Sequence, residues 1–227
     1  MSRLRARVRE IQRRMVRFCG GLSLRDAEYD FAYRHIVGEN LRVLDVGGVG
    51  SRLPLQLARR GFLVTVLDVR PYPERHPNLT VVQADFLTNS IPDGSFDYVV
   101  MISCIEHMGF GGYGDPVCED ADFRAMAQAL RILKPDGKLI LTFPFCDRYA
   151  VQPGFERWYD RARAHRLFEG LQVVDQEYYI PHARLFNRIV KWIPASLQQI
   201  VEADVMTKYG YQCNACFVVA PREEVRL

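Results

Sequence analysis

The feature that most constrains the fold is an alternation of strand-like and helix-like segments between residues 42 and 144. Short connections join these segments, and apolar residues dominate the strand-like runs. Such an order predicts a parallel sheet that helices cover on both faces. We expect strands at Arg42 to Val46, Phe62 to Asp68, Thr80 to Gln83, Phe96 to Ser103 and Lys138 to Pro144, and helices at Leu53 to Arg60 and Phe123 to Leu133.

The segments on either side of this core predict further elements of the same α/β domain. We expect a helix near Arg25 to Ile36, one helix with its entry loop within residues 147–168, strands at Leu171 to Ile180 and Ala215 to Ala220, and helices at Arg184 to Ile193 and Ala195 to Val201. The two late strands predict an antiparallel edge pair with an inserted helical lid. The expected organisation is a single doubly wound domain, with an N-terminal helical cap at 1–38, a core at 39–146, and the lid and last strands at 147–227.

Size and hydropathy suit one domain. The chain has 227 residues, of which 48% are hydrophobic, enough for one buried core. The longest apolar runs, such as Leu139 to Phe145, are too short to cross a bilayer, and no apolar signal segment follows the basic N-terminus. We therefore expect a soluble, cytoplasmic protein.

Charge is unevenly distributed along the chain. Residues 1–18 contain seven arginines and one acidic residue, Glu10, so this segment has a net charge of +6. Because the whole chain has a net charge of +3, the remaining residues have a net charge of −3. The apolar residues of segment 1–18 recur at helical spacing, which predicts an amphipathic basic helix. We favour a role for this helix as a cap that packs over a ligand site of the body. Contact with an anionic membrane surface is the alternative. The acidic body argues against a nucleic-acid enzyme.

Six cysteines are scattered along the chain, which favours reduced thiols over a disulfide framework. Cys213 and Cys216 form a CxxC, but no second pair or suitably spaced histidine accompanies them. Packing within an apolar strand is the favoured interpretation, and a zinc site is the alternative.

A glycine-rich turn follows the first expected strand. In LRVLDVGGVGS, residues 41–51, the strand ends near Asp45, and Gly47, Gly48 and Gly50 lie within the next five positions. Glycines let backbone approach a ligand closely, and the next helix offers free N–H groups at its start. In open parallel sheets the ligand lies beyond the carboxyl ends of the strands. The turn therefore predicts a nucleotide-type cofactor site.

Two further acidic residues end neighbouring strands. Asp68 lies about twenty residues after the turn, where an acidic side chain accepts hydrogen bonds from ribose hydroxyls. Asp85, in QADF, is placed to accept an adenine amino group. A single aspartate at a strand end is common, whereas the ordered series with FDYVV downstream is specific.

These motifs resemble those of the class I S-adenosylmethionine-dependent methyltransferases over roughly Asn40 to Pro144. VLDVGGVGS resembles the first motif of that family, QADF its adenine-edge motif, SFDYVVMIS its fourth-strand motif, and LRILKPDGKLILTFP the segment that enters its fifth strand. The resemblance implies a Rossmann-like fold and S-adenosyl-L-methionine as cofactor. It also implies a cofactor site formed by Asp45, Gly47, Gly48, Gly50, Asp68, Val69, Asp85, Phe86 and Ser103.

The glycine turn departs from the family pattern Asp-x-Gly-x-Gly-x-Gly. Val49 and Ser51 occupy the second and third glycine positions, while Gly48 and Gly50 stand in spacer positions. This spacing either weakens the grip on the methionine end or lets the loop shift to compensate. A nicotinamide-dependent dehydrogenase is the rival interpretation, but the turn lacks the last glycine of GxGxxG, and LKPDGKL has no role in that family.

The segment after the fourth strand, CIEHMGFGGYGDP at residues 104–116, predicts the acceptor side of the site. His107 is suited to remove a proton from an attacking hydroxyl, because histidine titrates near neutrality, and Glu106 and His107 are equally suited to anchor the loop. The segment resembles an EHxGxGxYGDP-type loop of an uncharacterised methyltransferase-like subgroup found in some glycan-related settings. That likeness implies a polyhydroxylated acceptor, bound by Glu106, Tyr113 and Asp115.

Two charged clusters near this loop each have two interpretations. The acidic residues Asp115, Glu119, Asp120 and Asp122 suit a magnesium ion, but we favour a helix N-terminus capped by Asp120 or Asp122 and predict no metal site. Arginines and aromatic residues from Arg148 to Arg166, continued from Arg184 to Trp192, suit an anionic or glycosylated acceptor. A solvated helix face, with tryptophan in the core, is the favoured interpretation of that block.

Together these features predict an S-adenosylmethionine-dependent methyltransferase that acts on a hydroxyl of a sugar, nucleotide-sugar or glycolipid precursor. His107 would be its catalytic base, and methyl transfer to nitrogen is less favoured. A non-catalytic S-adenosylmethionine-binding partner protein is the alternative from another class. An RNA methyltransferase is a third, supported only by the basic N-terminal segment.

Overall fold

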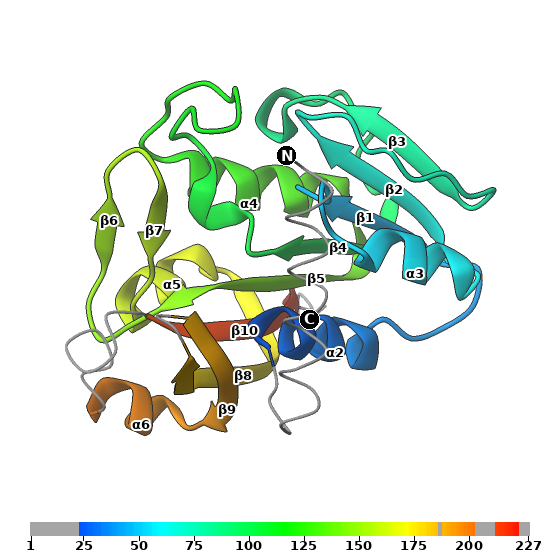
Figure 1. The fold of residues 1–227 in the computed structure, drawn as a ribbon. Coiled ribbons are helices and arrows are strands. Elements are labelled where there is room, and N and C mark those ends of the chain that lie inside the picture. Colours follow the sequence, from blue (N-terminus) through cyan, green and yellow to red (C-terminus); the bar gives the residue numbers. More distant parts are fainter. Residues whose placement is uncertain (1–22, 186–187, 203–211, 223–227) are drawn as a thin grey trace, which may run out of the picture.

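A mostly parallel sheet forms the centre of the protein (Figure 1). The computed structural model describes residues 23–185, 188–202 and 212–222. The sheet has eight strands in the order β3-β2-β1-β4-β5-β10-β8-β9. They are β1 (Arg42–Val46), β2 (Leu63–Asp68), β3 (Leu79–Gln83), β4 (Phe96–Ile102), β5 (Leu133–Phe145), β8 (Leu171–Leu185), β9 (Arg188–Ala195) and β10 (Cys213–Pro221).

The first five strands run parallel and confirm the predicted core. β4 is buried at nearly every position, as expected for a strand covered on both faces. β1 lies between β2 and β4, with Asp45 in register with Val66 of β2 and Val100 of β4. The carboxyl ends of these three strands therefore meet at one edge of the sheet.

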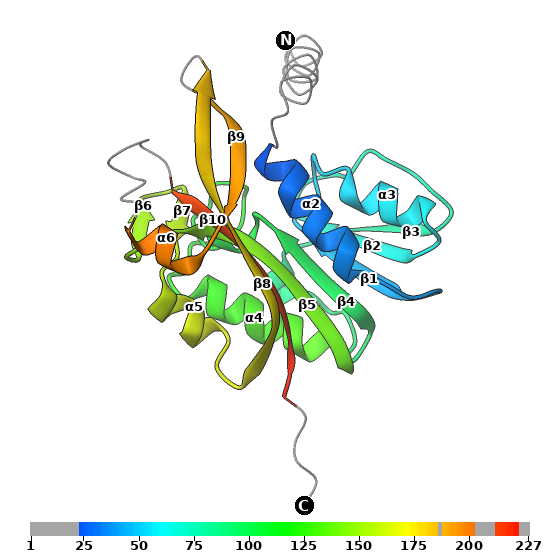
Figure 2. The same cartoon turned by 90° about the horizontal axis from the view of Figure 1, so that it is seen from below.

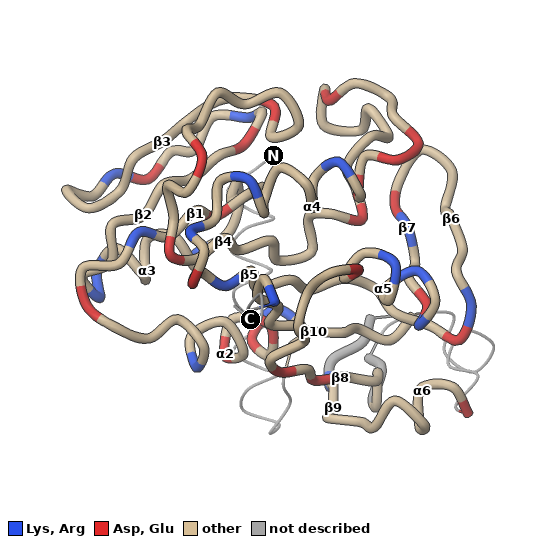
Figure 3. Tube along the Cα trace, turned by 180° about the vertical axis from the view of Figure 1, so that it is seen from behind, with Lys and Arg blue, Asp and Glu red and all other residues tan. Residues whose placement is uncertain are grey.

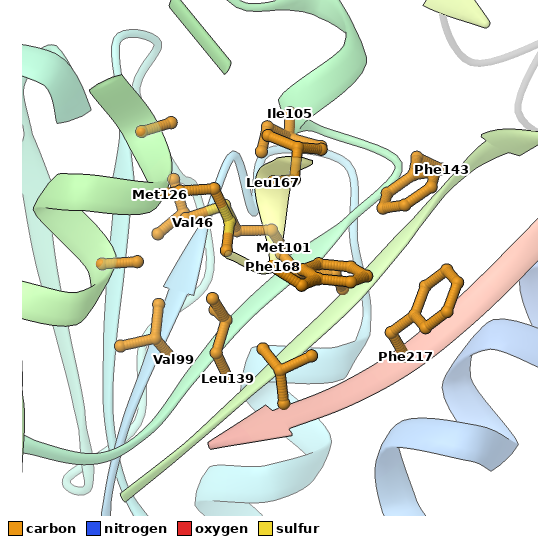
Figure 4. Close-up of a cluster of buried hydrophobic side chains, with 14 of the residues drawn as sticks. Val46, Val99, Met101, Ile105, Met126, Leu139, Phe143, Leu167, Phe168 and Phe217 are labelled. Carbon is orange, nitrogen blue, oxygen red and sulfur yellow. The ribbon is translucent and has the colours of Figure 1, made fainter. Parts of the chain in front are cut away.

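Helices cover both faces of the sheet (Figure 2). On one face, α2 (Leu24–His35) and α3 (Leu53–Arg59) bury Phe31 and Leu57 in one hydrophobic cluster. On the other, α4 (Ala121–Ile132) and α5 (Arg161–Leu167) contribute Met126 and Leu167 to a second cluster, shown in Figure 4. The doubly wound α/β prediction is confirmed.

The start of α4 differs from the prediction. Asp120 stands at the N-cap position, but its side chain makes no capping hydrogen bond, and it accepts one from the Cys118 thiol instead. Asp122 is fully buried and bonds both its carboxylate oxygens to the Arg163 guanidinium of α5. The predicted helix N-terminus is thus confirmed, but the side-chain cap by Asp120 was wrong, and Asp122 of the first turn binds Arg163 of α5.

The region after β5 contains more strand than the sequence predicted. Residues 184–193 were expected to be helical, but most of them belong to the antiparallel β8–β9 pair, which runs from Tyr178 opposite Ala195 to Leu185 opposite Arg188. Pairing with the exposed edge of β8 satisfies backbone groups that a helix would satisfy internally. The predicted helix at Arg184 to Ile193 was therefore wrong.

Residues 147–168 also contain two short strands in addition to the single predicted helix. A short hairpin of β6 (Ala150–Gln152) and β7 (Glu156–Trp158) precedes α5. The late helix and the last strand are confirmed as α6 (Leu197–Glu202) and β10. β10 lies between β5 and β8 and is antiparallel to both, as predicted for the last strand.

The CxxC of β10 packs into both cores. Cys213 belongs to the cluster beneath α4, and Cys216 to the cluster beneath α2, so the two thiols face opposite sides of the sheet. Burial raises the pKa of both, that of Cys213 to about 12. Within the described residues, no group of three or more metal-ligating side chains is found. The geometry supports packing.

The predicted basic helix at residues 3–18 lies outside the described residues, as does Cys19. Among the described helices, none combines the length and the apolar character that crossing a bilayer requires.

Candidate functional site

A cavity of about 280 Å³ opens where the carboxyl ends of β1, β2 and β4 meet. Ten of the sequence-predicted site residues line it: Gly47, Gly50, Asp68, Val69, Asp85, Phe86, Ser103, His107, Tyr113 and Asp115. Asp45 and Gly48 are not among the lining residues of this cavity, and Glu106 lines a different cavity. The structure thus brings the strand-end residues together, as the parallel topology requires.

The glycine turn is tightly packed against its neighbours. Gly47 has a φ of +72°, and a Cβ there would lie 2.4 Å from the Cys104 sulfur. A Cβ on Gly48 would lie 2.8 Å from Val66 and 3.1 Å from an Asp45 carboxylate oxygen. Both positions therefore exclude larger residues, although the spacing differs from the family pattern.

Val49 and Ser51, at the two atypical positions, have defined contacts. The Val49 N–H donates to Asp68 Oδ2 at 3.0 Å, which ties the turn to the end of β2. Ser51 Oγ accepts the Leu53 N–H at 3.1 Å and lies 2.9 Å from the Tyr29 hydroxyl. The departure from the usual glycine spacing is thus accommodated by hydrogen bonds.

Asp45 is buried beneath the turn, where it is 2% exposed. Burial raises its pKa to about 8, although Arg25 opposes the shift. Its Oδ2 atom makes no hydrogen bond within the described part of the chain. A buried acceptor without a partner beside a cavity is suited to a ligand that donates a hydrogen bond.

Asp68 is held in its ionised form. Both its oxygens accept from Arg70, through the backbone N–H and the guanidinium at 2.9 to 3.0 Å, and Oδ2 also accepts from Val49. Burial opposes ionisation, but the hydrogen bonds outweigh it and keep the pKa of Asp68 below its usual range. The Arg70 guanidinium also lies 4.6 Å from the centre of the Tyr113 ring. A ribose would have to share Asp68 with Arg70.

The next two strand ends are fixed by hydrogen bonds of their own. Asp85 Oδ1 accepts the Leu87 N–H at 2.9 Å, at the start of the short helix η1 (Phe86–Thr88). Ser103 has a φ of +45°, and its hydroxyl donates to the buried Glu28 carboxylate at 2.6 Å. A non-glycine residue in this conformation is uncommon and indicates a constrained position.

His107 ends the short helix η2 (Ile105–His107) beside the cavity. Its Nδ1 lies 2.8 Å from the Phe155 carbonyl, which only accepts, so Nδ1 carries the proton. Nε2 of the neutral ring is then free to accept a proton. That atom lies 3.9 Å from carboxylate oxygens of both Glu106 and Glu156.

The glycine-rich loop after His107 is fixed from within. Asp115 accepts the Gly109 N–H at 2.7 Å and the Tyr113 N–H at 3.3 Å, so its predicted ligand-binding carboxylate also shapes the loop. Arg157, which is 2% exposed, donates to the Met108 carbonyl at 2.6 Å. These hydrogen bonds hold the loop in a defined conformation at the edge of the cavity.

The basic-aromatic block is more buried than the favoured interpretation predicted. Arg157 lies against the Phe110 ring, and the Arg163 guanidinium lies between the Phe123 and Tyr149 rings. Trp192 is buried, as predicted. The solvated-face interpretation was wrong for Arg157, because its donors bind the carbonyls of the loop.

Sequence reasoning missed two residues, Glu28 and Glu156. Glu28 of α2 is fully buried and accepts from Ser103, Thr142 and Asn214, while Arg25 pairs with it at 3.3 Å. Helical spacing from the apolar residues Leu24 and Ala32 could have revealed it, because a glutamate at a buried helix position needs partners. Glu156 has no comparable signal.

Comparisons with known proteins agree with this fold. The family model described as "Caenorhabditis protein of unknown function, DUF268" matches residues 77–180. The ubiquinone biosynthesis O-methyltransferase of Xanthomonas oryzae pv. oryzae (strain PXO99A) is 34% identical over 130 residues, which cover 53% of this chain and 50% of the relative. The chain thus spans about half the length of the curated relatives that it matches.

Two solved structures share the architecture. One is the Burkholderia thailandensis 1,6-didemethyltoxoflavin-N1-methyltransferase, crystallised with S-adenosylhomocysteine, with a TM-score of 0.61, 16% identity, and coverage of 87% of this chain and 78% of that one. The other is a putative sarcosine dimethylglycine methyltransferase from Galdieria sulphuraria, with a TM-score of 0.62, 14% identity, and coverage of 88% and 86%.

The sheet order, the strand-end cavity and these neighbours define a class I methyltransferase fold. The sequence relatives resemble this chain over about half of its length, and they are ubiquinone biosynthesis O-methyltransferases.

Proposed function

We propose that this protein transfers the methyl group of S-adenosylmethionine to a hydroxyl of a small polar acceptor. The observation that carries the proposal is the strand-end cavity, in which Asp68, Asp85 and His107 lie around one space. The ubiquinone biosynthesis O-methyltransferases support transfer to oxygen. A sugar or other polyhydroxylated acceptor is the proposed substrate class.

The residues present fit the cofactor. Asp68 would accept hydrogen bonds from the ribose hydroxyls, and Asp85 with the buried Phe86 would contact the adenine. The turn from Gly47 to Gly50 would contact the methionine end of the cofactor, and the buried Asp45 would support that turn. When bound, S-adenosylmethionine supplies an already electrophilic methyl group, so the protein's contribution is largely positional.

His107 is the proposed base. The acceptor oxygen bonds to the methyl carbon as the carbon–sulfur bond breaks, and the sulfur keeps the electron pair. The hydroxyl proton passes to Nε2 of His107, and Nδ1 stays hydrogen-bonded to the Phe155 carbonyl. Glu106 and Glu156 would stabilise the resulting imidazolium from 3.9 Å.

The distribution of charge does not favour a nucleic acid as acceptor. In the part of the chain that the structure describes, basic and acidic segments are interspersed along the trace (Figure 3). Arg157 and Arg163, two prominent arginines near the loop, are already bound to protein groups. Binding of a phosphate backbone usually needs a continuous basic surface.

Isothermal titration with S-adenosylmethionine and S-adenosylhomocysteine tests the proposal. We expect both to bind with a Kd of roughly micromolar, typical of the substrate-level affinities of enzymes. Absence of binding by either compound would refute the proposal. Binding without methyl transfer to a broad panel of hydroxyl compounds, followed by mass spectrometry, would favour a non-catalytic binding partner instead.

A further inference from the structure

A second cavity, of about 390 Å³, adjoins the cofactor cavity. Ser103 and His107 line both cavities, so only these residues and their neighbours separate the two spaces. Glu106, Glu156, Gln212 and Asn214 contribute further polar groups to the second cavity. It lies on the side of His107 where Nε2 faces the two glutamates.

The carboxylates of this cavity retain unused acceptor capacity. Glu106 is 1% exposed, and its Oε2 atom has no hydrogen-bond partner among the described residues. Glu156 Oε1 accepts from Trp158 at 2.6 Å and from Gln212 at 3.3 Å, while its Oε2 lies 3.9 Å from His107. A buried carboxylate oxygen without a partner is costly unless a ligand satisfies it.

Burial raises the pKa of Glu106 well above its usual range, and the neighbouring Glu28 and Glu156 add to that shift. Arg25 opposes the shift. The described residues that line the cavity include neither lysine nor arginine. Arg25, the nearby cation, pairs with Glu28 at 3.3 Å. The cavity therefore combines two glutamates with one histidine, and a cationic ligand would supply the missing charge.

We propose that this second cavity is the acceptor site and that it takes a small molecule bearing an ammonium group, bound between Glu106 and Glu156. A hydroxyl of the same molecule would then lie beside Nε2 of His107. This inference rests on the proposed function, because it assigns the second substrate of that reaction. It favours a cationic acceptor over an anionic one.

Three two-carbon probes that differ chiefly in charge test the assignment. Ethanolamine carries a hydroxyl and an ammonium group, ethylene glycol replaces the ammonium with a second hydroxyl, and glycolate has a carboxylate in place of the aminomethyl group. Binding is followed by protein-observed NMR on the full chain saturated with S-adenosylhomocysteine, whose own binding is established first. Ligands of about four or five heavy atoms bind weakly, so millimolar affinities are expected.

We expect ethanolamine to bind about tenfold more tightly than ethylene glycol, and glycolate to bind most weakly of the three. Glu156→Gln and Glu106→Gln should each remove most of this preference while keeping S-adenosylhomocysteine affinity within about twofold. Glu169→Gln, at an exposed position in the turn before β8, is the matched control and should leave the preference unchanged.

The outcomes separate this inference from the proposed function. If S-adenosylhomocysteine fails to bind, the proposed function itself fails. If it binds but ethanolamine shows no advantage over ethylene glycol, or no probe binds, the ammonium site is refuted and the methyltransferase proposal stands. An advantage that survives in both glutamate variants would also refute it.

Discussion

The two cavities that meet at His107 are built in different ways. The walls of the first come mostly from successive strand ends, where Asp68 and Asp85 each accept hydrogen bonds from nearby backbone N–H groups. The second joins distant segments, with Glu106 after β4 and Glu156 on β7, and leaves one carboxylate oxygen unpartnered. The first cavity is thus lined by side chains already hydrogen-bonded to backbone groups, whereas the second contains a buried carboxylate oxygen with no partner among the described residues.

The largest expected effect concerns His107, which lines both cavities and is the proposed base. His107→Ala should lower kcat by roughly a hundredfold to ten-thousandfold, the usual contribution of a general base. S-adenosylhomocysteine affinity should change by less than about threefold, because the base acts on the acceptor. Stopped-time methyl-transfer assays and titration separate the two quantities. Retained turnover would show that His107 only anchors the loop.

A smaller effect is expected from the lining of the cofactor cavity. Asp68→Ala should weaken S-adenosylhomocysteine binding by roughly tenfold to a hundredfold, because hydrogen bonds to an ionised group are worth about 1.5–3 kcal/mol. Isothermal titration measures the change. Glu74→Ala, an exposed acidic residue beyond β2, is the control and should bind normally. Equal affinities of both variants would mean that Asp68 does not contact the ribose.

Arg70 offers a test with the opposite sign. The Arg70 guanidinium donates hydrogen bonds to both carboxylate oxygens of Asp68, so a ribose would have to displace at least one of them. Arg70→Ala should therefore tighten S-adenosylhomocysteine binding by about twofold to fivefold, the scale of a partly exposed ion pair. Arg75→Ala, at an exposed position, is the matched control. Weaker binding would instead show that Arg70 contacts the ligand directly.

The last test concerns the dependence of stability on pH through Asp45. Burial raises its pKa to about 8, above the value in the unfolded chain, so the folded state binds the proton more tightly. Its stabilising contribution is therefore complete below about pH 4 and is lost as pH rises towards 8. Asp45→Asn should lose less melting temperature between about pH 5 and pH 8 than the wild type. Parallel melting curves would contradict the assignment.

The sequence predicted one side of the site far better than the other. Asp68 and Asp85 follow strands with clear apolar patterns, and a parallel sheet necessarily brings such ends together. Glu156 lies on a three-residue strand with no pattern of its own, and Glu28 depends on pairing with Ser103 and Thr142, which are distant in sequence. Contacts of this kind follow from tertiary packing, which local periodicity does not encode.

The same distinction explains the errors in the fold. The segment 184–193 was expected to be helical, yet its described residues belong to β8 and β9, because the edge of β8 is available for pairing. Asp122 was expected at a helix cap, but Arg163 from α5 binds it in the core. In both cases the deciding partner is another segment of the chain.

Glu28 connects the two cavities through a single buried carboxylate. It holds α2 to Ser103 after β4, to Thr142 of β5 and to Asn214 of β10, and Ser103 and Asn214 line the second cavity. Cofactor binding that shifts Ser103 would therefore change the affinity of the second cavity for the acceptor. Acceptor binding would change the affinity for the cofactor by the same factor. The two substrates should accordingly bind as a thermodynamically coupled pair, with α2 as the shared support.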